Sequence, residues 1–460
     1  MIKRLLILLL FNLFLGKSVV MSQDTLRINF DQFLEIALEN SGQMKVVGTK
    51  VDLAENRTQL AKDQRFLPSL NFRSEHAVVP GVFSPEGRPE EEIYLDPYAK
   101  NDWDNPGLFT RLRVEGVQPL FIWGAVNKAI TAAKTGVKAT EQEYEATRAE
   151  LELRLHDLYY GYIFALEIER LLTDAEDKAD QIGRALEEQL EDNPAEVDES
   201  DIFKFRVFKA QFAIQKEEVV QSLVFVKETW KYALRNENEI IYEPKVRFLD
   251  PVKNQIEPIS FYQNSAKNNR AELLGLELGR TAMEQYIGSL KSKNLPGLYL
   301  GFTTTFASTP IRPRQPNPFI STPENTFNTA MGLTIRQNLN FFQARTSLER
   351  SKLEVNRLDF LKEAMQDGII LEVNEAYRNA ALAEVKVEKT DEALQIAKEW
   401  LRMEQLDYDL GFGESKDLVD AVRQELELRL SEMESIFEFN TAIAKLNKSA
   451  GLPLTRLSEN

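Results

Sequence analysis

Apolar residues recur every three and four positions along two long stretches of the chain, a pattern typical of helices that pack side by side along their length. In the second stretch the apolar residues lie seven apart without a slip, and small residues form a companion seam. The main seam consists of Val373, Ala380, Val387, Leu394, Leu401 and Tyr408, and the companion seam of Ala376, Ala383, Thr390 and Ala397. A helix of roughly 68 residues is about 100 Å long, because each residue adds about 1.5 Å. The pattern therefore predicts long helical hairpins, not a compact globule.

Four shorter stretches instead alternate apolar and polar residues, which is the period of β-strands. The predicted strands cover 69–79, 108–117, 297–307 and 328–337. Each has about 9–11 residues, the length that crosses a bilayer when the strand is tilted. An ordinary soluble sheet with one buried face alternates in the same way, so the alternation alone leaves both interpretations open.

The residues that flank these strands are consistent with a membrane barrel. The connections at 80–107 and 307–327 are long and rich in proline, as outer loops often are. Aromatic residues gather at the opposite strand ends, where such a barrel carries an aromatic girdle. These residues are Phe66, Phe121, Trp123, Phe341 and Phe342.

The order of these elements repeats along the chain. Leu67-Pro68-Ser69-Leu70 is matched by Leu295-Pro296-Gly297-Leu298, and other short matches follow in the same order. Each copy reads helix, strand, strand, long helix, returning helix, which is an internal duplication. We predict a first repeat at 23–240, with a helix at 30–65 and a hairpin at 121–235, and a second repeat at 241–460, with a helix at 257–292 and a hairpin at 342–449.

The N-terminus has the features of a secretory signal. Lys3 and Arg4 precede a short apolar run, and a plausible cleavage site follows near Ser22. We therefore predict a signal peptide at 1–22. The chain has no cysteine, so the stability of the exported protein must come from packing and not from disulfides. Its formal charge of −16 disfavours nucleic acid as a partner.

Four strands cannot close a barrel, and open strand edges in lipid cost several kcal/mol per unsatisfied group. If the strands cross a membrane, several chains must pool them. Three chains would give twelve strands, and a barrel of that size can surround an open pore.

The segment YDLGFGESKDLVDA, residues 408–421, interrupts the second hairpin. Gly411 and Gly413 permit the positive φ that a tight reversal between helices needs. Ser415 can cap the helix that follows. Asp417 and Asp420 lie three apart, so they share one helical face in or near the first turn.

In this combination and order the chain resembles the TolC-like outer-membrane efflux protein family, over about residues 25–452. The resemblance depends on the duplicated plan and on the second tip, where Tyr408, Gly411, Asp417 and Asp420 match the family's pattern. At the first tip Ser200 and Asp201 match. A basic residue often follows the turn glycine by two positions in the family, and Gly413 stands there in this chain.

The resemblance implies a homotrimer with a twelve-stranded β-barrel in outer-membrane lipid, continued by a long α-helical barrel through the periplasm. It implies the exit duct of a tripartite efflux pump or of a type I secretion system, working with a periplasmic adaptor and an inner-membrane pump. The tips, with Gly411, Gly413 and Ser415, would dock the adaptor.

The same resemblance suggests a gate at the tips. With threefold symmetry Asp417 and Asp420 would place six carboxylates around one axis, a ring that attracts cations. Tyr408 would form a latch by hydrogen bonding toward Ser200 or Asp201 of a neighbouring hairpin.

Enzymatic function finds little support. His76 and His156 are the only histidines and lie on different elements, so neither a zinc site nor a nucleophile–histidine pair is indicated, and no phosphate-binding glycine loop is present. We predict no cofactor. Two other interpretations stay open: a periplasmic adaptor, which would have one hairpin between β-rich halves, and a structural coiled-coil protein of the envelope.

Overall fold

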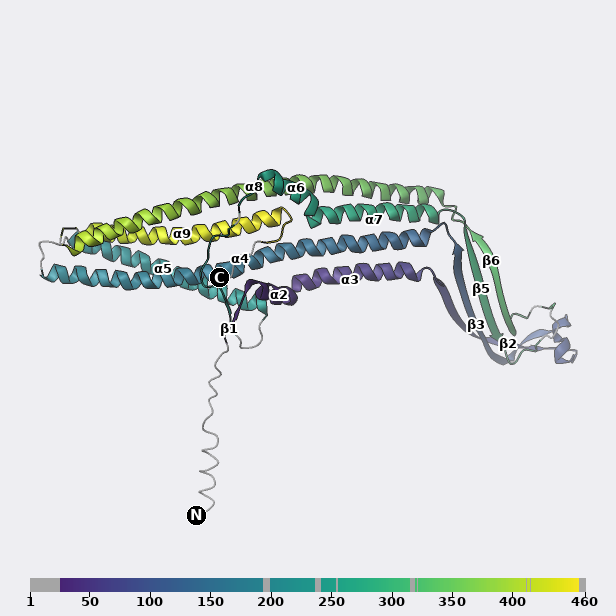
Figure 1. Ribbon diagram of the computed structural model, residues 1–460. Coiled ribbons are helices and arrows are strands. Elements are labelled where there is room, and N and C mark those ends of the chain that lie inside the picture. Colours follow the sequence, from purple (N-terminus) through teal and green to yellow (C-terminus); the bar gives the residue numbers. More distant parts are fainter. Residues whose placement is uncertain are drawn as a thin grey trace, which may run out of the picture. The chain divides into compact units, whose positions relative to one another are not determined.

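The computed structural model describes residues 25–192, 199–235, 241–253, 255–314, 319–320, 322–410, 412–413 and 415–454 (Figure 1). The predicted signal peptide lies outside these residues. The chain divides into two compact units. The first, which we call the helical unit, comprises Met1–Lys45, Thr147–Arg270 and Ile369–Asn460, and the second, the sheet unit, comprises Val46–Ala146 and Ala271–Gly368.

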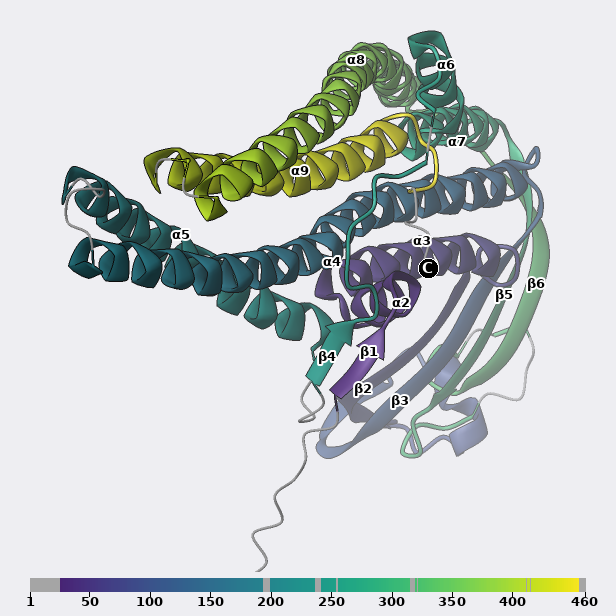
Figure 2. The same ribbon diagram turned by 60° about the vertical axis from the view of Figure 1, so that its left-hand side comes forward.

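The sheet unit contains one antiparallel sheet of four strands (Figure 2). The strands are β2 (Ser69–Phe83), β3 (Lys100–Phe121), β5 (Gly297–Ser308) and β6 (Thr326–Arg336), and their order in the sheet is β2-β3-β5-β6. The pairing of β3 with β5 joins the hairpins of the two sequence repeats into one surface. β2 and β6 are its edges.

The first hairpin is longer than the sequence predicted. The predicted strands 69–79 and 108–117 are parts of β2 and β3, and both ends of the connection predicted at 80–107, residues 80–83 and 100–107, are also strand. A register shift between Val79 and Gly81 interrupts the ladder, and the alternation of side chains breaks at that point. The remaining connection contains one 3₁₀ turn, η1 (Glu90–Leu95).

Helices of the sheet unit lead into and out of the strands. They are α3 (Gly42–Asp63), α7 (Ala271–Lys293) and the first parts of α4 (Ala125–Asp192) and α8 (Phe341–Asp409). At the start of α4, Trp123 and Gly124 both have positive φ, and the Trp123 indole donates a hydrogen bond to the carbonyl of Pro296, 2.8 Å away. The buried Ser289 hydroxyl of α7 donates to the carbonyl of Ala125.

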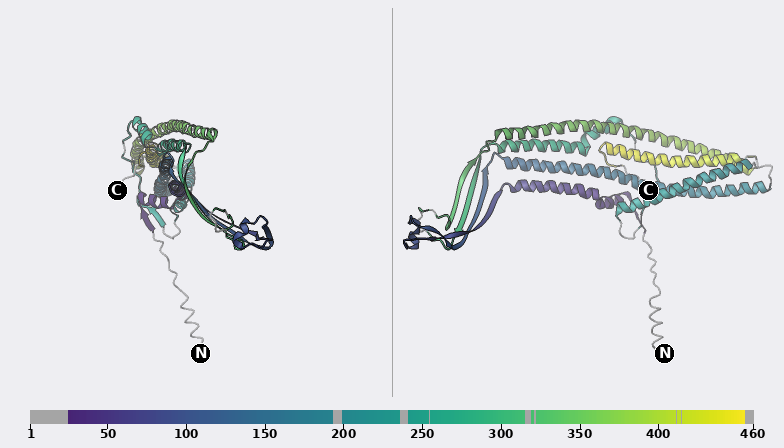
Figure 3. Two further views of the ribbon diagram at one scale, coloured as in Figure 1. Left: turned by 90° about the vertical axis from the view of Figure 1, so that its right-hand side faces the viewer. Right: turned by 180° about the vertical axis from the view of Figure 1, so that it is seen from behind.

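The helical unit is built around the two hairpins. These pair the later part of α4 with α5 (Glu199–Leu234) and the later part of α8 with α9 (Ser415–Ser449), as Figure 3 shows from behind. The seven-residue seam predicted on α8 is confirmed, because Val373, Ala380 and Leu394 are fully buried. Two short strands that the sequence did not reveal, β1 (Thr25–Ile28) and β4 (Ile241–Pro244), pair in parallel.

Each single helix predicted at the start of a repeat is in fact two helices. The segment 30–65 forms α2 (Phe30–Asn40) and α3, separated at Ser41, and the segment 257–292 forms α6 (Ile259–Asn269) and α7, separated at Arg270. Ser41 and Arg270 are both in an extended conformation, which ends the preceding helix. The prediction of uninterrupted helices is therefore wrong at these two positions.

Long-range hydrogen bonds fix both breaks to the ends of the returning helices. The Asn40 amide donates to the carbonyl of Leu234 at the end of α5, 3.0 Å away. The buried Arg270 guanidinium donates to the carbonyl of Ser449 at the end of α9, 3.1 Å away, and forms an ion pair with Glu372. Orphan carbonyls at two helix C-termini thereby gain donors from elsewhere in the chain.

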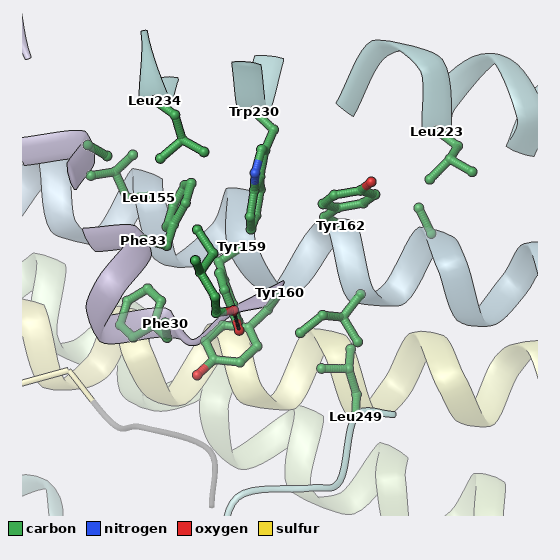
Figure 4. Close-up of a cluster of buried hydrophobic side chains, with 14 residues drawn as sticks. Phe30, Phe33, Leu155, Tyr159, Tyr160, Tyr162, Leu223, Trp230, Leu234 and Leu249 are labelled. Carbon is green, nitrogen blue, oxygen red and sulfur yellow. Dashed lines mark hydrogen bonds between the residues drawn. The ribbon is translucent and has the colours of Figure 1, made fainter. Parts of the chain in front are cut away.

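An aromatic core lies where α2, α4 and α5 meet (Figure 4). Phe33 stacks on Trp230 with 4.2 Å between ring centroids, and Tyr159 packs against both. The Tyr159 hydroxyl donates to the carbonyl of Ile28 in β1. Burying large rings in this way removes apolar surface from water and so stabilises the unit.

The segment after β4 is held against α4 and α9 by hydrogen bonds from its backbone. Leu249 N–H donates to the Glu167 carboxylate, and Val252 N–H donates to the Asn440 side chain. Asn440 in turn donates to the carbonyl of Asp250. Glu167 is only 6% exposed, and this desolvation raises its pKa to about 7.

Candidate functional site

Candidate functional residues gather in two regions. One region is the hairpin tips of the helical unit, and the other is the sheet, with its two faces. At the second tip α8 ends at Asp409, and the N–H groups of Phe412 and Gly413 both donate to the carbonyl of Asp407, at 2.9 and 3.0 Å. The chain thus reverses directly over the last turn of α8.

Position 413 requires a glycine because the backbone of the last turn of α8 lies too close for a side chain, and not because of an unusual φ. A Cβ at this position would lie 2.8 Å from the backbone nitrogen of Tyr408 and 3.0 Å from the carbonyl carbon of Asp407. Its φ is outside the left-handed region, so the prediction of a positive φ at Gly413 is wrong. Gly411 lies outside the described residues. The basic residue that the resemblance would place at 413 has no room in this turn.

Asp417 and Asp420 lie at the start of α9, and both are half-buried in the single chain. Beside them Leu418 and Ala421 are fully packed, and Val419 contacts the cluster of Ala179 and Phe205 on the first hairpin. Within the described part of the chain, neither carboxylate has a hydrogen-bond or ion-pair partner. The subunit therefore leaves two charges near a helix N-terminus, whose positive end makes their proximity less costly.

The predicted latch is only partly described. Tyr408 lies in the last turn of α8 and is half-buried. The side chains of Ser200, Asp201 and Ser415 lie outside the described residues, although the backbone of Ser415 begins α9 as predicted. The latch and the capping role of Ser415 stay predictions.

The first hairpin contributes a groove of about 420 Å³ near its tip. The ring of Phe205 lies against Gly183, so closely that a Cβ added at position 183 would be 2.7 Å from a ring carbon of Phe205. Lys209 forms a 2.6 Å ion pair with Asp180, and this hydrogen bond and charge lower the pKa of Asp180.

At the second tip Leu410 and Phe412 are exposed apolar side chains.

The sheet has one apolar and one polar face, as its alternation predicted. The register places most of the large apolar side chains of the four strands on the same side. They include Leu70, Phe72, Leu108, Leu112, Val114, Leu300, Phe302, Phe306, Phe327, Met331, Leu333 and Ile335. In the single chain this face is open, since Phe72 is 67% exposed and Met331 and Ile335 are each 74% exposed. The predicted girdle residues Phe66, Phe121, Trp123, Phe341 and Phe342 are exposed as well.

The polar face carries a cluster of arginines that sequence reasoning did not single out. Arg73 lies directly opposite Arg113, and Glu75 directly opposite Arg111. Glu75 contacts Arg111 at 3.3 Å and Arg73 at 3.8 Å. The alternation showed that each arginine belonged to a polar face, but only the register brings them side by side.

Within the described residues, no three His, Asp or Glu side chains converge in a way that could hold a metal ion. Nor does any helix in the described ranges combine the length and apolar character needed to cross a membrane.

Solved structures with the same fold are outer-membrane channels. The CmeC channel of Campylobacter jejuni has a TM-score of 0.70 at 16% sequence identity, covering 92% of this chain and 85% of that chain. The open-state MtrE channel of Neisseria gonorrhoeae gives 0.69 at 15% identity, covering 96% and 95%. VceC of Vibrio cholerae gives 0.67 at 14%, covering 93% and 97%. No family model and no curated protein sequence matches the chain.

These likenesses extend over nearly the whole chain, so the fold class predicted from the sequence is confirmed: the chain has the fold of the TolC-like outer-membrane channels. At this level of identity it is the fold that is shared.

Proposed function

We propose that this chain is one subunit of a homotrimeric outer-membrane channel that extends into the periplasm. Three copies of the sheet would form a twelve-stranded barrel, and the helical hairpins would continue it as a tunnel. The shared fold supports this proposal. The exposed apolar face of the sheet is the observation that carries it.

A soluble subunit would have to hide that face. Contiguous apolar patches larger than a few hundred Å² are rare on soluble monomers, whereas lipid covers such a face at no cost. The edges β2 and β6 also need partners, because unpaired backbone groups cannot be left in hydrocarbon. Pairing β6 of one copy with β2 of the next satisfies both edges in a closed ring of three.

In this assembly the polar face lines the lumen, and the channel serves as the exit duct of an efflux pump or of a type I secretion system. Its partners would be an inner-membrane pump and a periplasmic adaptor that docks at the tips around Gly413 and the exposed Phe412. The protein acts as a conduit and not as an enzyme. A chain with two helical hairpins and one four-stranded sheet does not fit the single hairpin between β-rich halves expected of an adaptor.

The tips would form the gate. Asp417 and Asp420 from three subunits would gather six carboxylates around the axis, and Tyr408 would hold the closed state by bonding toward Ser200 or Asp201. A ring of unpaired carboxylates binds divalent cations strongly, because neighbouring like charges repel each other until a cation intervenes.

Fractionation tests the assembly. The protein should sediment with outer membranes, resist carbonate extraction, and give a trimeric band after chemical crosslinking in detergent. A protein that is monomeric and soluble without detergent would rule out the channel.

Single-channel recording in planar bilayers tests the gate. An Asp417→Ala, Asp420→Ala double variant should conduct more readily than the wild type and lose block by divalent cations. Asp367→Ala, which removes an exposed carboxylate of α8 in the sheet unit, serves as the control and should keep the block. Tyr408→Phe should ease opening, and unchanged conductance would argue against the latch.

A further inference from the structure

One transverse row of the sheet's polar face carries two arginines on neighbouring strands and uncharged hydrogen-bond donors on the other two strands. The ladder aligns Arg73 of β2 with Arg113 of β3, Arg113 with Thr305 of β5, and Thr305 with Asn328 of β6. We call these four residues the arginine row. Its side chains are two guanidinium groups, a hydroxyl and an amide, all of which can donate hydrogen bonds to an anion.

The neighbouring rows do not neutralise it. On one side Glu75 is shared between Arg111 and Arg73, with the closer contact going to Arg111. On the other side Glu115 lies opposite Asn71, and within the described residues it forms no ion pair. Arg113 likewise has no hydrogen-bond or ion-pair partner in the described part of the chain.

Two like charges directly opposite each other on antiparallel strands destabilise the pairing. Their side chains start only about 4.5–5.5 Å apart, a spacing that one carboxylate or phosphate group can bridge with charge-assisted hydrogen bonds. The arrangement is unfavourable for the empty sheet and favourable once an oxyanion is present.

We propose that the arginine row is an anion-binding band in the lumen of the barrel, and that it makes the exit section of the duct selective for solutes carrying carboxylate or phosphate groups. This inference rests on the proposed trimeric channel, in which three rows would bring six guanidinium groups around one aqueous passage. Rings of arginine favour anions in pores for the same electrostatic reason that rings of carboxylate favour cations.

The second repeat sharpens the assignment. Its strands present Thr303, Thr305, Ala330 and Thr334 on the same face, and their only charged residue there is Arg336 at the end of β6, which stacks on Tyr299. The arginine pair therefore comes from the first repeat alone, and each subunit would contribute one patch, separated from the next by strands that carry no charged residue in this row.

Planar-bilayer recording under a KCl gradient tests the band, with tripolyphosphate added to the aqueous chamber as the anionic probe. To remove any influence of the tip carboxylates, the parent channel carries Asp417→Ala and Asp420→Ala. Adding Arg73→Gln and Arg113→Gln should lower the chloride-to-potassium permeability ratio at least threefold and weaken block by tripolyphosphate at least tenfold. The Arg73→Lys, Arg113→Lys pair keeps the charge and should retain most of both properties.

Arg357→Gln is the matched control, since it removes an exposed arginine of α8 whose ion-pair partner, Glu354, lies one turn away on the same helix. This control should change neither the chloride-to-potassium permeability ratio nor the block by tripolyphosphate. Conductance with the same permeability ratio and the same block in the glutamine variant would overturn the anion band while leaving the channel in place. If neither the wild type nor the parent conducts although both assemble as trimers, the channel proposal itself fails.

Discussion

The tip of the second hairpin and the polar face of the sheet both bring like charges together, but they do so with opposite signs and by different means. At the tip, Asp417 and Asp420 are neighbours because a helix places residues three apart on one face. On the sheet, Arg73 and Arg113 are neighbours because a hairpin aligns residues 40 positions apart. Charge clustering on a helix is a local property, whereas on a sheet it depends on register.

The two regions also differ in what would cover them. The tip stands on a helical unit whose core is already buried around Phe33 and Trp230. The sheet has no such core, since its apolar face is open and its stability in the proposed assembly comes from lipid and from neighbouring strands. The most informative experiments are those that separate these two sources of stability.

The largest effect is expected from a charge on the apolar face of the sheet. Met331→Arg should destabilise the trimer by about 2–4 kcal/mol, the cost of an arginine facing lipid near the middle of a bilayer. Ala330→Arg, one residue away on the polar face, should cost much less. Trimer content after heating in detergent, compared between these variants, gives the measurement. Equal trimer content for Met331→Arg and Ala330→Arg would mean that both faces of the sheet are in contact with water.

A smaller effect is expected at Glu167, a buried carboxylate of the helical unit that contrasts with the half-exposed aspartates of the tip. Its pKa is raised to about 7 by desolvation, above the usual value of 4.5. The folded state therefore holds the proton more tightly than the unfolded state. The stabilisation from this group is full below about pH 4.5 and is lost as the pH rises through 7.

Glu167→Gln should keep the hydrogen bond from Leu249 and remove this pH dependence. We expect the variant to match the wild type near pH 5 and to melt at a higher temperature near pH 8, as measured by thermal unfolding in detergent. Glu432→Gln, at a second carboxyl whose pKa burial also raises, offers a comparison on α9. A wild-type melting temperature that does not fall between pH 5 and pH 8 would contradict the assignment.

The smallest effect is expected at Gly413. An added Cβ must displace the backbone of Asp407 or Tyr408, so Gly413→Ala should cost about 1 kcal/mol. Because the strain is confined to the turn, hydrogen exchange should accelerate at residues 406–413 and stay unchanged in the core around Trp230. Gly279→Ala, where a Cβ would meet open space in the middle of α7, is the control and should be neutral or stabilising.

Sequence reasoning reached those features that are set by short-range periodicity. The seven-residue seam of α8 and the two faces of the sheet followed from spacing alone. The breaks at Ser41 and Arg270 did not, because the helical pattern continues across both positions and the deciding contacts come from Leu234 and Ser449, far along the chain. The extension of β2 and β3 was hidden by the register shift near Val79, which ends the alternation without ending the ladder.

The candidate sites divide in the same way. Asp417 and Asp420 could be found from their spacing, whereas the arginine row required knowledge of which residues face each other across strands. The role of Gly413 was assigned to the wrong cause, because a glycine in a turn suggests an unusual φ, and only coordinates reveal that the neighbouring backbone leaves no space for a side chain.

The hydrogen bonds from Asn40 and Arg270 have a mechanical consequence. They fasten the last carbonyls of α5 and α9, while the opposite ends of these helices lie at the hairpin tips. A rod anchored at one end can swing but cannot slide lengthwise. Any widening at the tips must then be an angular movement about these two anchor points, and its amplitude grows with the roughly 50 Å that separate anchor from tip in a helix of about 35 residues.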